Sequence, residues 1–429
     1  MSDTVDWGQT PLIALLSSME SGSRPKGGVR GIINGVPSLG GEHLNSRGGF
    51  NFDNVKYVPS PYFDSMRRGH IQRGDLLVVK DGATTGKVSL VGDDFPFDHA
   101  VANEHLFVCR PKSIDARYLF WYLYSDEGQR RILKHFRGSA QGGITRDFAE
   151  GTLVPVAPTP GEQQELADLI SSALTRAFSA NDHLAAARTV IERFRQSVLA
   201  AACSGRLTQD WRSFDSDAPS VDDLPARWER VELRTLAAEG IPVSYGIVKP
   251  GPEVVGGVPY VRQQDVIDGK VLIDQLAHTS PEIAGKHSRS ELREGDVLLC
   301  IIRNLRVAIV PAGIDGANIT QGMVRIRPSS AVLGEYLAIY LASPTAQRWM
   351  HDRYVGLAMP RINVEDARLI PVPLPPLDEQ REIVQAASQL LTLAQEMAER
   401  IDAASAHLNR SSQAVLAKAF SGELSRANA

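Results

Sequence analysis

The chain has 429 residues, of which 43% are hydrophobic and 22% charged, a balance typical of a folded globular protein that excludes general disorder. Lys and Arg number 46 against 50 Asp and Glu, so the net charge of −4 argues weakly against a stand-alone nucleic-acid binder but allows a local basic surface. No apolar run approaches the ~20 residues that cross a bilayer, and three dispersed cysteines predict a reducing, cytoplasmic setting.

Residues 1–157 are the first predicted element, a mixed α/β domain rich in Gly, Pro, Val and Ile. Asp75–Val79 is typical of a buried strand, and Leu119–Leu123 is typical of a short helix. The loop after the strand carries four polar or basic side chains: Lys80, Thr84, Thr85 and Lys87. This loop lacks the first Gly and the final Ser or Thr of a phosphate-binding P-loop, so we expect a basic hairpin loop there.

A basic segment closes this domain. Gly128–Arg146 contains no acidic residue, and its main candidates for DNA contact are Arg130, Arg131 and Lys134. Such a pattern is typical of the solvated face of a helix or of a surface that contacts phosphate, and both interpretations stay open at this point.

Residues 158–207 predict a long helix. Thr159 and Glu162 fit a capping box at its start, and Gly205 is placed to end it in a left-handed conformation. An acidic, proline-punctuated linker follows at 208–227; among its residues are Asp210, Asp215, Asp217, Pro219, Asp222, Asp223 and Pro225.

The rest of the chain repeats this plan, with a second mixed domain at 228–374, a second long helix at 375–424 and a tail at 425–429. The helix ends Ser197–Leu207 and Ala414–Leu424 share seven of eleven residues at a shift of 217. Further matches occur in the same order along both halves, so the chain contains two copies of one unit.

The second copy keeps the frame of the first but changes its loop. Gly295–Ile302 predicts the matching strand, and the loop that follows carries Arg303, Asn304 and Arg306. Arg and Asn are suited to bidentate hydrogen bonds with guanine and adenine edges. The strands around the loop are alike in both copies, but the loop residues differ. This pattern is expected if each copy uses its loop to bind a different DNA sequence, and also if the loop sequence is under no constraint. In the second helix, Asp378 is the expected cap.

Both long helices carry apolar residues at alternating steps of three and four, which is the heptad pattern of a coiled coil. The main predicted seam positions are Ile170, Leu184, Ile191, Phe194, Leu390, Met397, Ile401 and Leu408. Each helix could pack on its own domain, but the shared phase favours pairing of the two helices. An antiparallel direction is favoured because it would put the two mixed domains at opposite ends of the helix pair, whereas a parallel direction would crowd them at one end.

Catalytic motifs are missing from the sequence. It contains no Gly-x-Ser-x-Gly, His-Glu-x-x-His or Cys-x-x-Cys motif. His99 and His105 near Cys109 have the wrong spacing for a metal site. We therefore expect no catalytic residue, no metal site and no cofactor in this chain.

Several phrases, taken together in order, resemble the specificity (S) subunit of Type I restriction-modification systems over essentially the whole chain. They comprise the Glu-Gln helix starts, the Ser-Gly-x-Leu helix ends and four phrases of the second domain: Pro160–Gln163, Pro375–Gln380, Ser204–Leu207, Ser421–Leu424, Leu224–Trp228, Ser244–Gly251, Gly257–Arg262 and Asn318–Gly322.

The resemblance implies an α+β fold with two pseudo-repeated mixed α/β target recognition domains separated by an antiparallel coiled coil of two long helices. Each domain would read half of a split sequence in double-stranded DNA, and the coiled coil would set the gap. Two methylation subunits would supply S-adenosylmethionine and adenine methylation, and restriction/translocase subunits would supply ATP- and magnesium-dependent cleavage. No membrane is implied. Two alternatives are a coiled-coil scaffold joining protein-binding domains and the DNA-reading part of a stand-alone methyltransferase or nuclease.

The complete set of candidate DNA-binding residues consists of basic and polar side chains in these domains: Lys26, Arg30, Lys80, Thr84, Thr85, Lys87, Arg130, Arg131, Lys134, Tyr245, Lys249, Arg262, Gln264, Arg303, Asn304, Arg306, Gln321 and Arg361.

Overall fold

The structure is a computed structural model that describes residues 7–138, 142–212 and 224–424. The chain forms two compact units. Unit 1 comprises Met1–Ala185 with Asp402–Ala429, and unit 2 comprises Ala186–Ile401. Residues 213–223 of the predicted linker, the tail 425–429 and the loop residues 139–141 lie outside the described residues.

The mixed domain of unit 1 contains two four-stranded sheets and a two-stranded ribbon in its described residues. The first sheet is antiparallel, in the order β2 (Leu16–Ser21), β9 (Leu106–Pro111), β6 (Leu76–Val79) and β7 (Val88–Leu90). The second has the order β4 (Lys56–Val58), β3 (Val36–Leu39), β8 (Ala100–Ala102) and β5 (His70–Ile71), and β3 and β8 are parallel. The ribbon pairs β1 (Gln9–Pro11) with β10 (Leu153–Pro155). The helices are α1 (Ser60–Ser65), α2 (Ala116–Tyr124), α3 (Asp126–Leu133) and α4 (Phe148–Gly151).

Unit 2 repeats this topology. Its antiparallel sheet has the order β12 (Ser244–Tyr245), β20 (Met323–Ile326), β17 (Val297–Cys300) and β18 (Val307–Ile309). A second sheet joins β16 (Ala277–Thr279), β13 (Val258–Val261) and β19 (Asn318–Ile319), with β13 and β19 parallel. Two ribbons pair β11 (Glu229–Glu232) with β21 (Pro371–Leu374) and β14 (Val266–Ile267) with β15 (Lys270–Val271). The helices are α6 (Pro281–Lys286), α7 (Gly334–Ala342), α8 (Pro344–His351) and α9 (Val364–Arg368). The predicted α+β fold and internal repeat are confirmed.

The predicted strands and helices form because their side chains suit a core. All four residues of β6 and of β17 are buried, so these central strands are apolar on both faces. Asp115 caps α2 by accepting hydrogen bonds from Arg117 N and Tyr118 N, and Ser125 caps α3 by accepting one from Gly128 N.

Two long helices complete the units: α5 (Pro160–Cys203) and α10 (Leu377–Phe420). The predicted capping box is confirmed, because Glu162 N donates to Thr159 Oγ1 at 3.2 Å and Thr159 N donates to Glu162 Oε2 at 3.0 Å. Gly205 follows α5 with a left-handed φ of 76°, as predicted. Asp378 is the second residue of α10 and not its cap, so that prediction is wrong.

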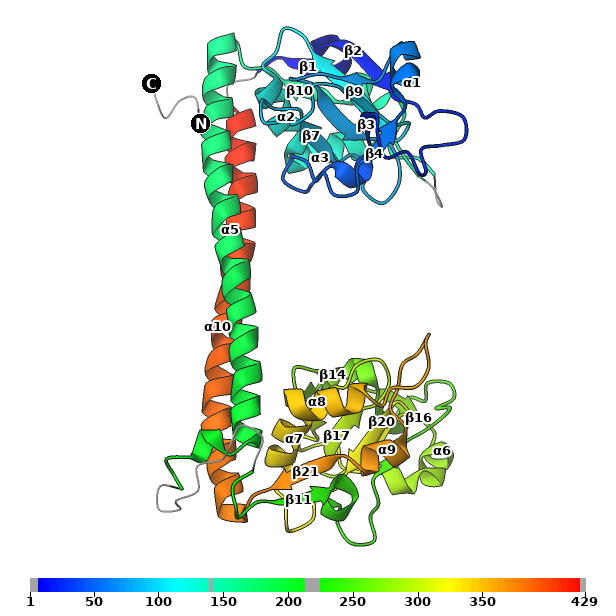
Figure 1. The fold of residues 1–429 in the computed structure, drawn as a ribbon, viewed down its shortest axis with the longest axis vertical. Coiled ribbons are helices and arrows are strands. Elements are labelled where there is room, and N and C mark those ends of the chain that lie inside the picture. The colour runs from blue at the N-terminus through cyan, green and yellow to red at the C-terminus, as the bar shows by residue number, and fades with distance from the viewer. Residues whose placement is uncertain (1–6, 139–141, 213–223, 425–429) are drawn as a thin grey trace. The chain divides into compact units, whose positions relative to one another are not determined.

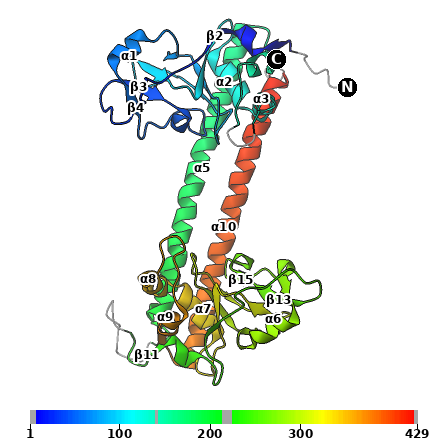
Figure 2. The same ribbon diagram turned by 90° about the vertical axis from the view of Figure 1, so that its right-hand side faces the viewer.

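Each unit brings together opposite ends of these two helices, as the ribbon diagrams show (Figures 1 and 2). In unit 1 the core contains Leu166 and Ile170 from the start of α5 and Leu416 and Ala419 from the end of α10. In unit 2 the core combines the end of α5 with the start of α10 through Val198, Ala202, Ile383 and Ala387. The two helices therefore pair in the antiparallel direction, which confirms the predicted pairing.

The predicted heptad seam is only partly correct. Ile170 and Ile191 are buried, and Leu184, Leu390, Ile401 and Leu408 are half-buried. Phe194 and Met397, however, are 39% and 46% exposed, so their assignment to the seam is wrong. In α10 the buried residue is Ala398, one position after Met397. Ala398 lies four residues after the buried Ala394 and therefore on the same face of the helix.

Polar side chains also make contacts between α5 and α10. In unit 1, Ser405 Oγ donates to Asn181 Oδ1 at 2.8 Å, and Asn181 Nδ2 donates to Asn409 Oδ1 at 3.1 Å. In unit 2, Arg195 donates to Gln395 Oε1 at 3.0 Å. Such polar pairs fix the register of paired helices, because any slip leaves their donors and acceptors without partners.

The repeated helix starts anchor the domains to the helices. Gln163 and Gln380 are buried, and each accepts a main-chain N–H from the segment before the short helix α2 or α7, from Asp115 at 3.0 Å and from Leu333 at 2.8 Å. In the second copy, Trp228 Nε1 also donates to the buried Glu379 at 2.9 Å. The repeated Gln therefore has the same role in both copies, whereas Glu162 of the first copy bonds Thr159 at the start of α5.

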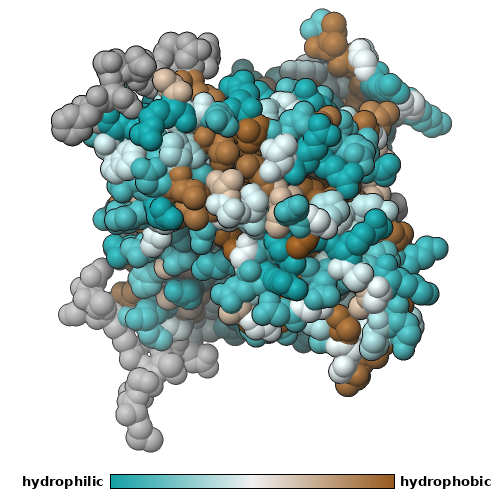
Figure 3. Space-filling model, turned by 90° about the horizontal axis from the view of Figure 1, so that it is seen from below, coloured by the Kyte–Doolittle hydropathy of each residue, from teal (hydrophilic) through white to brown (hydrophobic). Residues whose placement is uncertain are grey.

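The surface is mainly polar where Figure 3 displays it. Hydrophilic residues cover most of that face, and apolar residues form smaller groups among them. Among the helices that the structure describes, none is long and apolar enough to cross a membrane.

A glycine allows the two sheets of each domain to approach each other. A β-carbon at Gly22 would lie 1.6 Å from Ala102 O, and one at Gly246 would lie 1.8 Å from Ile319 O. These two carbonyl oxygens belong to β8 and β19, the strands of the second sheets that pair in parallel. The main chain therefore has no room for a side chain at either position.

We predict that Gly246→Ala lowers the free energy of unfolding by about 3 kcal/mol, because the backbone of β19 must move to admit the methyl group. The matched control is Gly285→Ala in α6, where no heavy atom lies within 4 Å of the new methyl group. The control should stabilise the chain by roughly 0.5–1 kcal/mol. Urea unfolding of the two full-length variants measures both effects, and equal stabilities would contradict the close approach.

Candidate nucleic-acid interface

A hairpin loop occupies the same place in each unit. Residues 80–87 join β6 to β7 in unit 1, and residues 301–306 join β17 to β18 in unit 2. These are the two loops in which the sequence predicts readers, and each lies at the end of a buried central strand. The four-stranded antiparallel sheet of each unit therefore carries one of the two loops.

A glutamine on the neighbouring helix holds each loop. Gln129 in unit 1 and Gln347 in unit 2 donate their side-chain amide to one oxygen of the loop and to one oxygen of the preceding helix. The accepting atoms are Gly86 O at 3.0 Å, Leu123 O at 2.7 Å, Leu305 O at 3.0 Å and Leu341 O at 2.7 Å. Neither glutamine was predicted from the sequence, although the two match at a shift of 218 within the repeat.

A second loop crosses each hairpin loop. In unit 2, Val355 and Arg361 exchange both main-chain hydrogen bonds and close the loop 355–361, and Arg303 N donates to Pro360 O at 2.7 Å. In unit 1, Arg137 and Gly143 make the equivalent pair of bonds. The two loops of each unit thus form one braced element.

Two further loops are bonded to the hairpin loop of unit 2, through Gln263 and Gly322, and a third is bonded to one of these. Gln263 Nε2 donates to Ile302 O at 3.0 Å and to Gly322 O at 2.8 Å, and Gln321 N donates to Ile247 O at 2.9 Å. These bonds join five segments that carry most of the predicted DNA-binding residues of the second copy. We name them the unit 2 loop surface: 246–249, 262–265, 301–306, 320–322 and 355–361.

This surface is cationic. Lys249, Arg303, Arg306 and Arg361 are exposed, while Asp265, the acidic residue of these segments, is buried. Asp265 accepts two hydrogen bonds from the guanidinium of Arg262, which raises the pKa of Arg262. Arg262 is thus engaged within the protein, and the other cations set the charge that faces solvent.

Arg303 and Asn304 lie in the middle of the unit 2 hairpin loop. Both are exposed, and neither side chain has a hydrogen-bond or ion-pair partner among the described residues. Arg303 also has a φ of 61°, a left-handed conformation that costs free energy for a residue with a side chain. Its backbone is held there by its bond to Pro360 and by Tyr354 Oη, which donates to Arg303 O at 3.3 Å.

The other candidates of unit 2 divide by their contacts. Gln264, Gln321 and Tyr245 are exposed, and Tyr245 lies on β12 at the edge of the sheet. Arg306 donates to Val266 O at 2.9 Å, so part of its guanidinium serves the fold.

The hairpin loop of unit 1 carries less free charge. Thr84 is exposed, whereas Thr85 donates to Gly82 O at 2.7 Å. Lys87 is half-buried and donates to Leu44 O at 3.1 Å, and the ammonium of half-buried Lys80 lies 5.8 Å from the centre of the Phe107 ring. Lys26 and Arg30 are exposed on the loop between β2 and β3.

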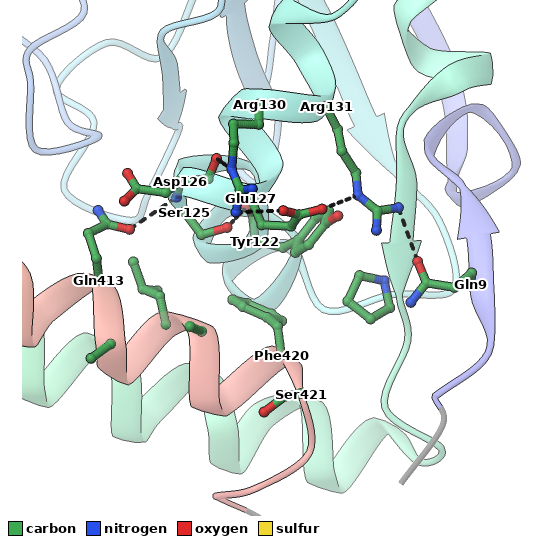
Figure 4. A pocket seen from close by; sticks show the side chains of 14 residues that line it. Gln9, Tyr122, Ser125, Asp126, Glu127, Arg130, Arg131, Gln413, Phe420 and Ser421 are labelled. Carbon is green, nitrogen blue, oxygen red and sulfur yellow. Dashed lines mark hydrogen bonds and ion pairs between the residues drawn. The ribbon is translucent and has the colours of Figure 1, made fainter. Parts of the chain in front are cut away.

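Part of the basic segment of unit 1 lines a cavity. Arg130 and Arg131 line a cavity of about 530 Å³ between α3 and the end of α10, and both pair with Glu127 (Figure 4). Arg131 also donates to Gln9 at 3.2 Å and to Leu153 O at 2.9 Å, so it ties α3 to the β1–β10 ribbon. Lys134 is exposed. Arg131 is therefore mainly a structural residue.

The thiols are unsuited to nucleophilic chemistry. Cys109, Cys203 and Cys300 are buried and free, and burial raises the pKa of each thiol to about 12. They stay protonated at neutral pH and are poor nucleophiles. Within the described part of the chain, no group of three or more His, Cys, Asp or Glu side chains could hold a metal ion.

Comparison with known proteins finds one family repeatedly. Residues 249–403 match the family described as the Type I restriction modification DNA specificity domain. The Type I restriction enzyme EcoBI specificity subunit of Escherichia coli is 28% identical over 414 residues, which is 92% of this chain and 84% of that subunit. The Type I restriction enzyme EcoDI specificity subunit of Escherichia coli is 28% identical over 343 residues, 75% of this chain and 73% of that subunit.

Solved structures share the fold. A chain from a structure titled "Structural basis underlying complex assembly and conformational transition of the type I R-M system" matches with a TM-score of 0.69 and 19% identity, over 98% of both chains. The HsdS subunit of Thermoanaerobacter tengcongensis matches with a TM-score of 0.51 and 19% identity, over 98% of this chain and 97% of that chain.

We predict that Gln347→Ala speeds amide hydrogen exchange in residues 301–306 and leaves residues 80–87 unchanged. Loss of the amide leaves Leu305 O and Leu341 O without this donor, at a cost of about 1–3 kcal/mol. Gln129→Ala is the matched control, and it should speed exchange in residues 80–87 and leave residues 301–306 unchanged. Faster exchange in both loops with either variant would show that the glutamines do not hold the loops separately.

Proposed function

This chain belongs to the family of Type I restriction-modification specificity subunits, and we propose that it reads a bipartite sequence in double-stranded DNA for such a complex. The observation that carries the proposal is the repeated frame with different loop residues. Thr84 and Thr85 in unit 1 and Arg303 and Asn304 in unit 2 stand on equivalent hairpins that equivalent glutamines hold.

The two hairpins suit different sequences. Arginine and asparagine make bidentate hydrogen bonds with guanine and adenine in the major groove, and threonine contacts several bases through its hydroxyl and methyl groups. Each unit would then read its own half-site. Lys26, Arg30 and Lys249, which are exposed, would contact phosphates and position the units without selecting a sequence.

The catalytic steps belong to partners in this proposal. Two methylation subunits would bring S-adenosylmethionine and methylate adenine, and restriction/translocase subunits would use ATP and magnesium. Partner cations would share the phosphate contacts, so a net charge of −4 is compatible with DNA binding.

We predict that Arg303→Ala or Asn304→Ala relaxes selectivity at one half-site by about 1–3 kcal/mol, because each substitution removes one bidentate interaction with a base. The measurement is selection of bound sequences from a random duplex library by the complex with its methylation subunits. Arg193→Ala, which removes an exposed charge from α5, is the control and should leave both half-sites unchanged.

Two results would argue against the proposal. If each loop variant relaxed both half-sites equally, the units would not read independently. If the unaltered complex selected no sequence, the chain would be a scaffold that joins protein-binding domains.

A further inference from the structure

The loop 355–361 of unit 2 exposes apolar side chains to solvent. Leu357 is 105% exposed, Met359 49% and Val355 42%. Single exposed aliphatic residues are common on protein surfaces, but three on one short loop are a local concentration. The core of unit 2 does not use Leu357 or Met359, so the fold does not explain these side chains.

The loop presents them on a braced backbone. Its ends are joined by the paired hydrogen bonds between Val355 and Arg361, Gly356 has the left-handed φ of 89°, and Pro360 O accepts from Arg303 N at 2.7 Å. This last bond places the apolar loop directly beside the residue proposed to read guanine. A side chain displayed in this way loses little conformational entropy of the backbone when it binds.

The charges around the loop indicate what it contacts. Arg361 closes the loop and Arg303 is bonded to it at Pro360, and both side chains are exposed. The loop 355–361 itself contains no acid, and exposed Asp352 lies three residues before it. Arg353 lies over the Trp349 ring, with 3.8 Å from its guanidinium carbon to the ring centre. An apolar tip beside two exposed arginines complements a DNA groove, where phosphates border the base edges, better than it complements a neutral or basic protein surface.

The first copy lacks these side chains. Its corresponding segment, between Gly138 and Gly143, reads Ser-Ala-Gln-Gly where the second copy reads Leu-Ala-Met-Pro. The apolar tip is therefore a property of the second copy and not of the shared scaffold, as expected for a residue that sets specificity.

We propose that Leu357 and Met359 are specificity-determining residues that contact thymine methyl groups in the half-site read by unit 2. The inference rests on the proposed function. Thymine displays its C5 methyl group in the major groove, beside the edges that Arg303 and Asn304 are suited to bind, and apolar side chains recognise that methyl group. In the proposed function the partner subunits methylate adenine, and every adenine in duplex DNA is paired with a thymine, so a half-site that is methylated offers at least one such group.

The test uses the complex with its methylation subunits and duplexes that carry its own modified sequence. In one duplex, uracil replaces thymine throughout the half-site of unit 2, which removes only the C5 methyl groups. In a second, the replacement is in the other half-site. We expect the unaltered complex to bind the first uracil duplex about fourfold more weakly for each contacted methyl group. Any effect of the second duplex should be the same in the unaltered complex and in variants of the loop 355–361.

The double variant Leu357→Ala, Met359→Ala should bind the thymine duplex more weakly and lose the preference for thymine over uracil in the unit 2 half-site. Leu393→Ala, the same substitution at a 50% exposed position of α10, is the control and should keep that preference. A thymine preference that survives in the double variant would overturn the inference. Loss of assembly with the methylation subunits would overturn it too, because the loop would then contact a protein.

The design separates this inference from the function on which it rests. A complex that distinguishes its target from scrambled DNA but shows no thymine preference contradicts only the methyl contact. A complex that does not distinguish the two DNAs contradicts the proposed function itself.

Discussion

Each compact unit completes its core with a helix segment from the other sequence repeat, and the rest of the structure depends on this exchange. Leu416 and Ala419 of α10 are fully buried in the core of the first domain, and the Phe420 ring lies 5.1 Å from that of Tyr118. In unit 2, α5 contributes Val198 and Ala202. Burying such side chains stabilises each unit by about 1–3 kcal/mol per large residue. Neither domain therefore has a complete core without the helix of the other repeat.

Polar contacts that occur in both copies connect the long helices to the hairpin loops of the candidate interface. Tyr118 Oη donates to Pro155 O at 2.7 Å, and its counterpart Tyr336 donates to Pro373 O at 2.5 Å, so the short helix in each domain is tied to the strand that precedes the long helix. The next short helix carries Gln129 or Gln347, which holds the hairpin loop. A continuous path of buried contacts thus links the helix pair to each loop. The frame stays constant because every step has a defined partner, while the loop tips face solvent and can vary.

The elements that could be predicted from the sequence are those formed by buried residues that occur in both copies. The strands at Leu76–Val79 and Val297–Cys300, the short helices, the capping box at Thr159 and the antiparallel pairing all follow from periodicity, caps and the repeat. At Phe194 the predicted seam is wrong by one residue, because apolarity favoured Phe194 over Arg195, whereas the helix contact includes Arg195 through a hydrogen bond to Gln395. Apolar patterning does not detect a seam position that a polar pair stabilises.

The candidate site was less predictable because its residues gather through tertiary contacts. Arg303 and Asn304 could be named from their place in the repeat, but the brace from Pro360 depends on a loop more than 50 residues later in the sequence. Arg131 looked like a phosphate contact because its charge is visible in the sequence, whereas its partners Glu127, Gln9 and Leu153 are visible only in the fold. Charge identifies candidates, and contacts decide which of them are free to bind.

The central claim is that each unit reads one half of the target. Amide hydrogen exchange of the complex with its methylation subunits tests it most directly, on duplexes in which neither, the first or the second half-site is scrambled. The account predicts that the intact target protects residues 80–87 and 301–306, and that scrambling one half-site removes protection from only one of these loops. Simultaneous loss of protection in both loops, or protection of neither loop by the intact target, would contradict it.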